Sequence, residues 1–196
     1  MREQPFLPRR RSVRLPVFDY SQPSSYFITI CVQNNRQLFG RIINGKMMLN
    51  TFGKIVDTCW REIPNHFAAV NLGTYVIMPN HLHGIIALRG HVRSNDAIVN
   101  SEPQAKNLRR ARHAVPLRNT HGFGAPTAHS IPTVVRSFKS TVTKLFRHAA
   151  DNPKFHLWQR NYYEHVIRNE DDFRATSEYI RLNPARWVFD RDHIVI

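Results

Sequence analysis

The sequence predicts one α+β domain with the ferredoxin-like order β-α-β-β-α-β, an antiparallel sheet covered by helices, and one further helix at the end. Three observations lead to this fold class. A chain of 196 residues suits a single domain with its own core. Runs rich in β-branched and aromatic residues alternate with stretches of helical periodicity. No apolar run is long enough to span a membrane. We therefore place one domain at residues 20–188.

The first part of this domain should contain a strand, a hairpin and a helix. Tyr26–Gln33 is rich in β-branched and aromatic residues, which predicts a central strand. The pair Asn44-Gly45 is a strong turn signal and predicts a short hairpin. Thr51 can cap a helix that runs to about His66, because apolar residues follow the i, i+3, i+4, i+7 rule there.

Two more strands and a second helix should follow. The apolar runs Val70–Met78 and Leu82–Leu88 are separated by a Pro-Asn pair and predict adjacent strands. A helix should begin at Pro132, because proline is favoured at the first helical position. Its predicted buried stripe consists of Val135, Phe138, Val142 and Leu145.

The last two elements complete the predicted order. A strand is expected within Phe155–Ile167. Asn169 then caps the terminal helix, whose first turn is acidic, as the helix dipole prefers. A pair of histidines falls on a predicted strand, and a tyrosine motif falls on this terminal helix.

Positive charge is concentrated in segments that lack apolar periodicity. Twenty-eight Lys and Arg against fourteen Asp and Glu give a net charge of +14, which favours nucleic acid as a partner. Residues 1–19 are interpreted as a basic arm, residues 89–130 as a flexible basic insertion, and residues 189–196 as a tail. The predicted phosphate-binding residues are Arg9, Arg10, Arg11 and Arg14 of the arm, Arg136 and Lys139 of the second helix, and Arg168.

The cysteine content and the N-terminus indicate a cellular compartment. Cys31 and Cys59 cannot build a disulfide framework and are interpreted as small core residues. The N-terminus is basic but lacks the apolar region of a signal peptide. We expect a cytoplasmic, nucleoid-associated protein that does not bind membranes, as a monomer or homodimer.

Two histidines on one predicted strand form the clearest local motif. In Met78–Ile86, His81 and His83 are two residues apart, so their side chains share one face of a strand. Two neighbouring imidazoles can bind one divalent metal ion. The alternative is a pair of ordinary surface histidines, but the long apolar flanks indicate a central strand, where paired polar side chains need a reason.

A tyrosine and an asparagine lie one turn apart on the terminal helix. Tyr179 and Asn183 flank a predicted buried face made of Phe173, Thr176 and Ile180. Both side chains can lean over the sheet edge, toward the histidines. The alternative is a half-buried tyrosine at a helix border, which is common for this residue.

Together these motifs resemble a known family. His81-Leu82-His83 is similar to the His-hydrophobe-His core of the HUH endonucleases. A late Tyr-x-x-x-Asn-Pro at residues 179–184 resembles the single-tyrosine transposases of the IS200/IS605 type, and within them the REP-associated tyrosine transposases. Further similar segments are Phe138-Lys139-Ser140, Trp158-Gln159 and residues 162–169. The resemblance covers roughly residues 20–88 and 131–188.

The resemblance implies a metal-dependent single-stranded-DNA endonuclease and strand transferase that acts on hairpin-forming repeat DNA. Tyr179 resembles the nucleophile that forms a 5′-phosphotyrosine intermediate. His81 and His83 resemble the metal-binding pair, and Asn183 stands where insertion-sequence relatives commonly have a glutamine ligand. A divalent ion would neutralise the phosphate oxygens, and Mg²⁺ or Mn²⁺ suits these donors.

Other tyrosines are rival nucleophiles. Tyr162 and Tyr163 lie on the strand before the terminal helix and are interpreted as packing or DNA-stacking residues, because unpaired bases stack on aromatic rings. Tyr75 is interpreted as a core residue.

Two other functional classes compete with the nuclease. A non-catalytic binder of single-stranded nucleic acid can use the same fold, but the aromatic run typical of RNA-recognition domains is missing. A zinc hydrolase needs a third His, Cys or carboxylate at a typical spacing, and none follows the His pair.

Overall fold

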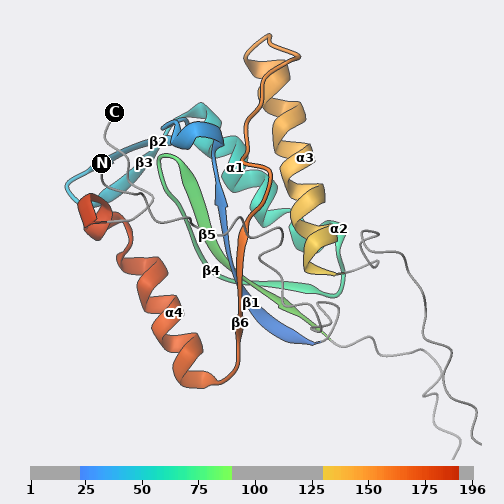
Figure 1. Ribbon diagram of the computed structural model, residues 1–196, viewed down its shortest axis with the longest axis vertical. Helices are drawn as coiled ribbons and strands as arrows, with labels where there is room; N and C mark the ends of the chain where they lie inside the picture. Colours follow the sequence, from blue (N-terminus) through green and yellow to red (C-terminus); the bar gives the residue numbers. More distant parts are fainter. Residues whose placement is uncertain (1–22, 90–129, 190–196) are drawn as a thin grey trace, which may run out of the picture.

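A four-stranded antiparallel sheet forms the centre of the protein (Figure 1). The computed structural model describes residues 23–89 and 130–189. The strand order is β4-β5-β1-β6, which is the order of a ferredoxin-like sheet when the separate hairpin is set aside. The α+β prediction is therefore confirmed. The strands are β1 (Ser24–Cys31), β4 (Val70–Ile77), β5 (His81–Leu88) and β6 (Tyr163–Ile167).

Helices and a hairpin complete the described fold. Asn44 and Gly45 both have positive φ, 50° and 71°, and they join the two strands of the hairpin as predicted. The remaining elements are the hairpin strands β2 (Gly40–Ile43) and β3 (Lys46–Leu49), the helices α1 (Thr51–Arg61), α2 (Ile63–His66), α3 (Ile131–Ala149) and α4 (Glu170–Leu182), and the 3₁₀ turns η1 (Gln33–Asn35) and η2 (Pro184–Phe189).

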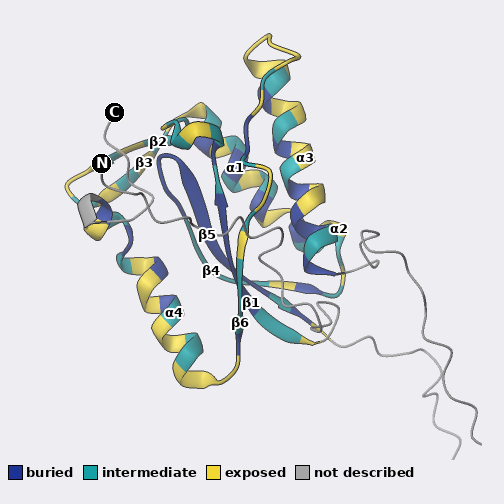
Figure 2. Ribbon diagram, viewed as in Figure 1, coloured by how far each residue is buried: buried dark blue, intermediate teal, exposed yellow. Residues whose placement is uncertain are grey.

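The larger core lies between the sheet and helices α1 and α3. Figure 2 shows that β1 and β5 are almost wholly buried. The Trp60 ring of α1 meets the Phe138 ring of α3 edge-on, with centroids 5.3 Å apart. Side chains alternate along the strands, so Ile28 and Leu82 point into this core while their neighbours Thr29 and His83 point to the other face.

Gly84 allows this core to close. A Cβ atom at Gly84 would collide with the Trp60 ring. The tryptophan therefore packs directly on the backbone of β5, one residue after His83. Close packing on one side of β5 thus accompanies the histidine pair on its other side.

Several predicted boundaries and one core residue were wrong. Asn50, not Thr51, caps α1, and its side-chain oxygen accepts a hydrogen bond from the Gly53 amide. On α3 the residue that faces the core is Phe146, which is 1% exposed, whereas Leu145 is 42% exposed. The apolar stripe of a helix with 3.6 residues per turn passes from Val142 to Phe146, four residues on, and leaves Leu145 beside it.

The basic arm and most of the insertion lie outside the described residues, and so do Arg9, Arg10, Arg11 and Arg14. In the described part of the chain, no helix has the length and apolar character needed to cross a membrane.

Candidate active site on the second face of the sheet

His81 and His83 lie side by side on β5, on the face that α4 covers. Their side chains are 0% and 1% exposed, and their Nε2 atoms are 3.0 Å apart. Two imidazole lone pairs at this distance repel each other unless a proton or a cation lies between them. The two imidazoles on the paired polar face of this strand are therefore close enough to share one proton or to bind one cation between them.

The opposite ring nitrogens are held by neighbouring side chains. The Nδ1 atom of His83 is 2.8 Å from the hydroxyl of Thr29, its cross-strand partner on β1. The Nδ1 atom of His81 is 2.7 Å from the Asn80 side-chain oxygen. Both rings are thereby oriented with their Nε2 atoms toward the same point, as second-shell hydrogen bonds orient metal-binding histidines.

Asn80 also determines which nitrogen of His81 carries the proton. The Asn80 Nδ2 atom donates to the backbone oxygen of Asn35, 3.3 Å away, and this contact fixes the orientation of the amide. Its Oδ1 then faces His81 and can only accept, so the Nδ1–H of His81 must be the donor. The Nε2 atom keeps its lone pair for a cation.

Tyr179 of α4 lies next to the histidine pair. Its hydroxyl oxygen is 3.4 Å from Nε2 of His83, and its ring meets Phe27 edge-on at 6.0 Å. Phe27 also stacks against the His83 ring at 5.4 Å. Tyr179 remains 39% exposed, so it lies at the rim of a buried imidazole pair.

In the sequence, Asn183 lies between two residues that contact the histidines. Tyr179, one turn earlier, approaches His83, and the Trp187 ring, one turn later in η2, lies 5.9 Å from the His81 ring. Asn183 is 3% exposed, and its Oδ1 atom is buried without a hydrogen-bond partner among the described residues. A buried amide oxygen in this state needs a donor or a cation.

These donors suit a hard or borderline divalent ion. Neighbouring ligands of a six-coordinate ion at about 2.1 Å lie about 3 Å apart, which matches the separation of the two Nε2 atoms. Two imidazole nitrogens and one amide oxygen leave further positions for water or phosphate. Among residues 23–89 and 130–189, no group of three His, Cys, Asp or Glu side chains is placed so that it could hold a metal ion.

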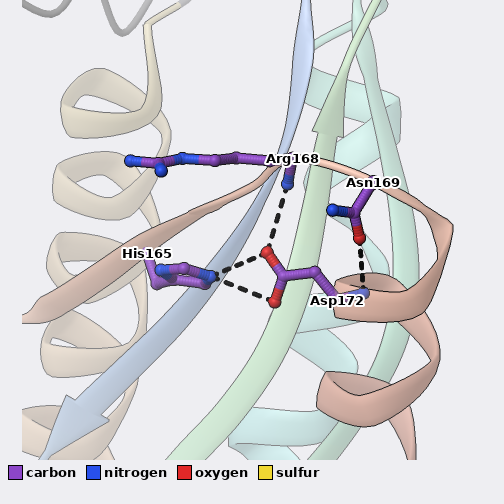
Figure 3. A network of polar contacts seen from close by, with 4 residues as sticks. All are labelled: His165, Arg168, Asn169 and Asp172. Carbon is purple, nitrogen blue, oxygen red and sulfur yellow. Dashed lines mark hydrogen bonds and ion pairs between the residues drawn. The ribbon is translucent and has the colours of Figure 1, made fainter.

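Contacts at its first turn fix helix α4 on the sheet (Figure 3). Asn169 caps the helix by accepting from the Asp172 amide at 2.8 Å, as predicted. Asp172 in turn accepts from the Arg168 amide and pairs with His165 of β6 at 3.0 Å. The hydrogen bond from His165 lowers the pKa of the Asp172 carboxyl. This network sets the direction in which α4 carries Tyr179.

The apolar contact beneath α4 is small. Ile180 packs with Phe27, Ile85 and Ile167, and Phe173 lies against the same cluster. Ile180 and Phe173 were two of the three residues predicted for the buried face of this helix, and both lie against the sheet. The helix is thus held at one end by polar contacts and along its length by one narrow stripe.

The predicted DNA-binding residues in the described regions differ in their surroundings. Arg136 and Arg168 are exposed. The ammonium of Lys139 donates to the backbone oxygens of Gln159, Arg160 and Asn161, the first at 2.6 Å. Burial lowers the pKa of Lys139 to about 8. The side chain of Lys139 therefore holds the loop before β6, a contact that its basic character alone did not reveal.

The rival tyrosines are distributed over both faces of the sheet. Tyr163 is 40% exposed and meets Phe27 edge-on at 6.1 Å, so it lies on the face that carries Tyr179. Tyr162 packs against the larger core. Tyr75 packs there too, with its hydroxyl donating to Asp57 and accepting from Arg61.

Sequence reasoning missed Thr29, Asn80 and Trp187 as parts of this site. Thr29 had a detectable signal, because it is the polar residue within the apolar run of β1 and faces His83 once the strands are paired. Asn80 directly precedes His81, but its contact with Asn35 depends on the η1 turn, 45 residues away in the chain.

Comparisons with known proteins give a sequence relative and several distant structural matches. No protein-family model matches the chain. The structure of a REP-associated tyrosine transposase bound to a REP hairpin is 18% identical, covers 91% of this chain and 76% of its own, and has a TM-score of 0.49. A transposase candidate from Deinococcus radiodurans R1 is 13% identical, covers 87% of this chain and 98% of its own, and has a TM-score of 0.44.

The relative is close over nearly the whole length. An uncharacterized protein of Haemophilus influenzae is 40% identical over 185 residues, which cover 94% of this chain and 93% of that protein. The chain therefore belongs to the same protein family as this Haemophilus influenzae protein.

Proposed function

We propose that the chain is a metal-dependent single-stranded-DNA endonuclease and strand transferase whose nucleophile is Tyr179. The substrate class is hairpin-forming DNA with an unpaired segment at the cleavage position. The proposal joins the resemblance of the His-x-His and Tyr-x-x-x-Asn-Pro motifs to the geometry of the site.

One observation carries the proposal. A partly exposed tyrosine hydroxyl lies 3.4 Å from an imidazole nitrogen that itself lies 3.0 Å from a second, equally buried imidazole nitrogen. A nucleophile next to a buried site for positive charge is what phosphodiester cleavage requires, because negative charge builds on the phosphate oxygens. Two elements distant in sequence, β5 and α4, supply these groups, so the arrangement depends on the fold.

The chemistry is a transesterification that conserves the number of phosphoester bonds. The Tyr179 oxygen attacks phosphorus and loses its proton, while the bond from phosphorus to the 3′ oxygen breaks and that oxygen gains a proton. The product is a 5′-phosphotyrosyl DNA and a free 3′ hydroxyl. Attack of a 3′ hydroxyl on this ester restores a DNA strand and releases Tyr179, so strand transfer needs no nucleotide cofactor.

The chain's own residues position the reactants. Phe27 holds the rings of both Tyr179 and His83, and the hydroxyl of Thr29 and the amide of Asn80 orient the imidazoles. A divalent ion, Mg²⁺ or Mn²⁺, held by His81, His83 and Asn183, would supply the positive charge that stabilises the five-coordinate phosphorus of the transition state.

The test is a covalent adduct assay with a matched pair of tyrosine variants. Full-length protein is incubated with 5′- or 3′-labelled single-stranded hairpin DNA and Mn²⁺ and analysed on a denaturing gel. Tyr179→Phe should bind the DNA normally but lose the adduct and cleavage by more than about a thousandfold, because only the nucleophilic oxygen is removed. Tyr163→Phe is the control, since Tyr163 is 40% exposed, Tyr179 is 39% exposed, and both meet Phe27 edge-on.

Two results would contradict the proposal. Normal cleavage by Tyr179→Phe would transfer the nucleophile to another residue, Tyr163 first. Binding of hairpin DNA with neither cleavage nor adduct in wild-type protein, at any Mg²⁺ or Mn²⁺ concentration, would instead favour the non-catalytic binding protein.

A further inference from the structure

The exposed end of α3 carries two grooves that are lined by cationic side chains and lie apart from Tyr179 and the histidines. The first, here called the helix groove, has a volume of about 520 Å³ and is lined by Ser140, Lys144, Arg147 and His148 of α3. The second, the turn groove, has a volume of about 580 Å³ and is lined by Asn34 and Arg36 next to η1, together with Lys154 and His156.

Residues 151–156 form a strap that separates the two grooves. Asp151 and Pro153 line the helix groove, while Asn152, Lys154, Phe155 and His156 line the turn groove. Residues 151, 153 and 154 lie in turns, so the strap is a turned ridge between the two grooves. Figure 1 shows this segment as the outermost tip of the α3 end of the protein.

Two arginines fix the strap from opposite sides. Arg147 donates to the Phe155 carbonyl at 3.1 Å, and Arg36 donates to the His156 carbonyl at 2.9 Å. The guanidinium of Arg36 also lies over the Phe155 ring, 4.7 Å from its centroid. The ridge is thus ordered before any ligand arrives, which reduces the entropic cost of binding.

The charge of the grooves suits phosphate. Each groove is lined by one arginine, one lysine and one histidine. Among the residues that line the two grooves, Asp151 of the helix groove is the one acid. Two hydroxyl groups line the helix groove beside Pro153, and three side-chain amides line the turn groove beside Phe155. Hydroxyl and amide groups, with Arg and Lys, make most of the contacts that proteins form with sugar and phosphate.

The turn groove is connected to the candidate active site. Asn34 lines the groove, while Asn35, the next residue, accepts a hydrogen bond from Asn80, which holds His81. A polyanion that lies in this groove is therefore two side-chain contacts away from the imidazole pair.

We propose that the two grooves bind the two sugar-phosphate rows of a DNA duplex, with the strap as the ridge between them. This inference rests on the proposed function and specifies where the stem of a hairpin is held. Duplex DNA presents two phosphate rows separated by a groove about 6–12 Å wide, whereas a single strand presents one row. Two cationic grooves on either side of an ordered ridge match the duplex.

The test measures binding without cleavage. In the Tyr179→Phe background, the double variant Lys144→Ala/Lys154→Ala removes one exposed cation from each groove. The matched control is Lys46→Ala/Lys54→Ala, which removes two exposed lysines from β3 and α1. Affinity for a fluorescent blunt duplex and for a single strand of equal length is titrated by anisotropy at several salt concentrations.

The groove variant should lower duplex affinity by about tenfold or more at low salt. The slope of log affinity against log salt should become shallower by about 1.8, because each lost phosphate contact removes about 0.9. Single-strand affinity should fall less, and the control should change neither slope. An unchanged duplex slope overturns the proposal, and so do equal losses on the two probes, since these would describe a binding surface for single strands.

The outcome is independent of the chemistry at Tyr179. A groove variant with a reduced duplex slope supports the surface even if wild-type protein forms no covalent adduct. An adduct in wild-type protein with an unchanged slope in the groove variant supports the proposed function and removes the surface. Urea unfolding of all variants checks that the exposed lysines have no part in folding.

Discussion

The two faces of the sheet differ in what they bury. The α1 and α3 face encloses a large aromatic cluster that includes Trp60, Phe138 and Phe146. The α4 face has a small apolar cluster around Ile180, next to two buried imidazoles. This difference indicates that stability resides mainly in one layer, while the proposed chemistry lies in the other. Residues on the α4 face can then change reactivity with little effect on folding.

The strongest test of this division compares one side chain from each face. His83→Ala should reduce cleavage by more than about a hundredfold, because a proposed metal ligand is lost, while the free energy of unfolding should fall by less than in the core variant that follows. Trp60→Ala should lower the free energy of unfolding by about 3–5 kcal/mol. Asn183→Ala should lose less activity than His83→Ala, since water can replace one oxygen ligand. Adduct yield and urea unfolding are measured for all three.

The opposite pattern would contradict the division. If His83→Ala unfolds the protein as readily as Trp60→Ala does, the imidazole pair is part of the core. Wild-type cleavage that persists undiminished in EDTA would separately remove the metal from the site.

A second test probes the contact beneath the histidines. Asn80→Ala should weaken Mn²⁺ binding by about 10–100-fold, because His81 loses the acceptor that keeps its proton on Nδ1. Asn80→Asp keeps an acceptor at this position and should recover much of the affinity. Calorimetric titration with Mn²⁺ measures both variants. Equal losses in both would mean that Asn80 acts through its contact with Asn35 instead.

A third test changes Gly84, which faces Trp60 on the side of β5 opposite the histidines. Gly84→Ala places a methyl group against the Trp60 ring and should lower the free energy of unfolding by about 1–3 kcal/mol. Metal affinity per folded molecule should change less, because Gly84 points away from the site. Urea unfolding and Mn²⁺ titration of the same preparation separate the two effects. A loss of metal affinity with unchanged stability would show that the two faces are coupled through β5.

The smallest expected effect is a pH dependence at Lys139. Its pKa in the folded protein is lowered to about 8 from an ordinary 10.5, so between these values the unfolded chain binds more protons. The contribution of this lysine to the free energy of unfolding should therefore rise with pH across that window, by less than about 1 kcal/mol after solvent screening. Wild type and Lys139→Met are compared by urea unfolding from pH 7.5 to about 10.5. A difference that is constant or falls with pH would contradict this assignment.

Periodicity predicted the elements, but it could not rank residues at their edges. The alternation along β5 gave the shared face of His81 and His83, and the cap at Asn169 was placed correctly. Leu145 and Phe146 are both apolar, and only the packing of α3 on the sheet selects Phe146. Leu145 and Phe146 are three and four residues after Val142, so both fit the helical rule, and the rule alone does not separate them.

The candidate site was predicted in part, for a related reason. Spacing in one strand or one helix brought together the His pair and the Tyr-Asn pair separately. The distance between the two pairs depends on how α4 returns over the sheet, which the network of His165 and Asp172 controls. Lys139 shows the converse case, because its charge predicted a solvent-facing phosphate contact and its ammonium lies on three backbone oxygens.

The four residues from His81 to Gly84 encode both faces of the protein at once. Odd positions bear the imidazoles, and even positions bear Leu82 and the glycine on which Trp60 rests. Insertion or deletion of a single residue at the start of β5 would turn every following side chain to the opposite face. The imidazoles of His81 and His83 would then point into the aromatic core, and Leu82 would point to the other face. A change of one residue in the length of this strand is thus incompatible with the fold, whatever its effect on activity. Relatives are therefore expected to differ there by substitution and not by a one-residue gap.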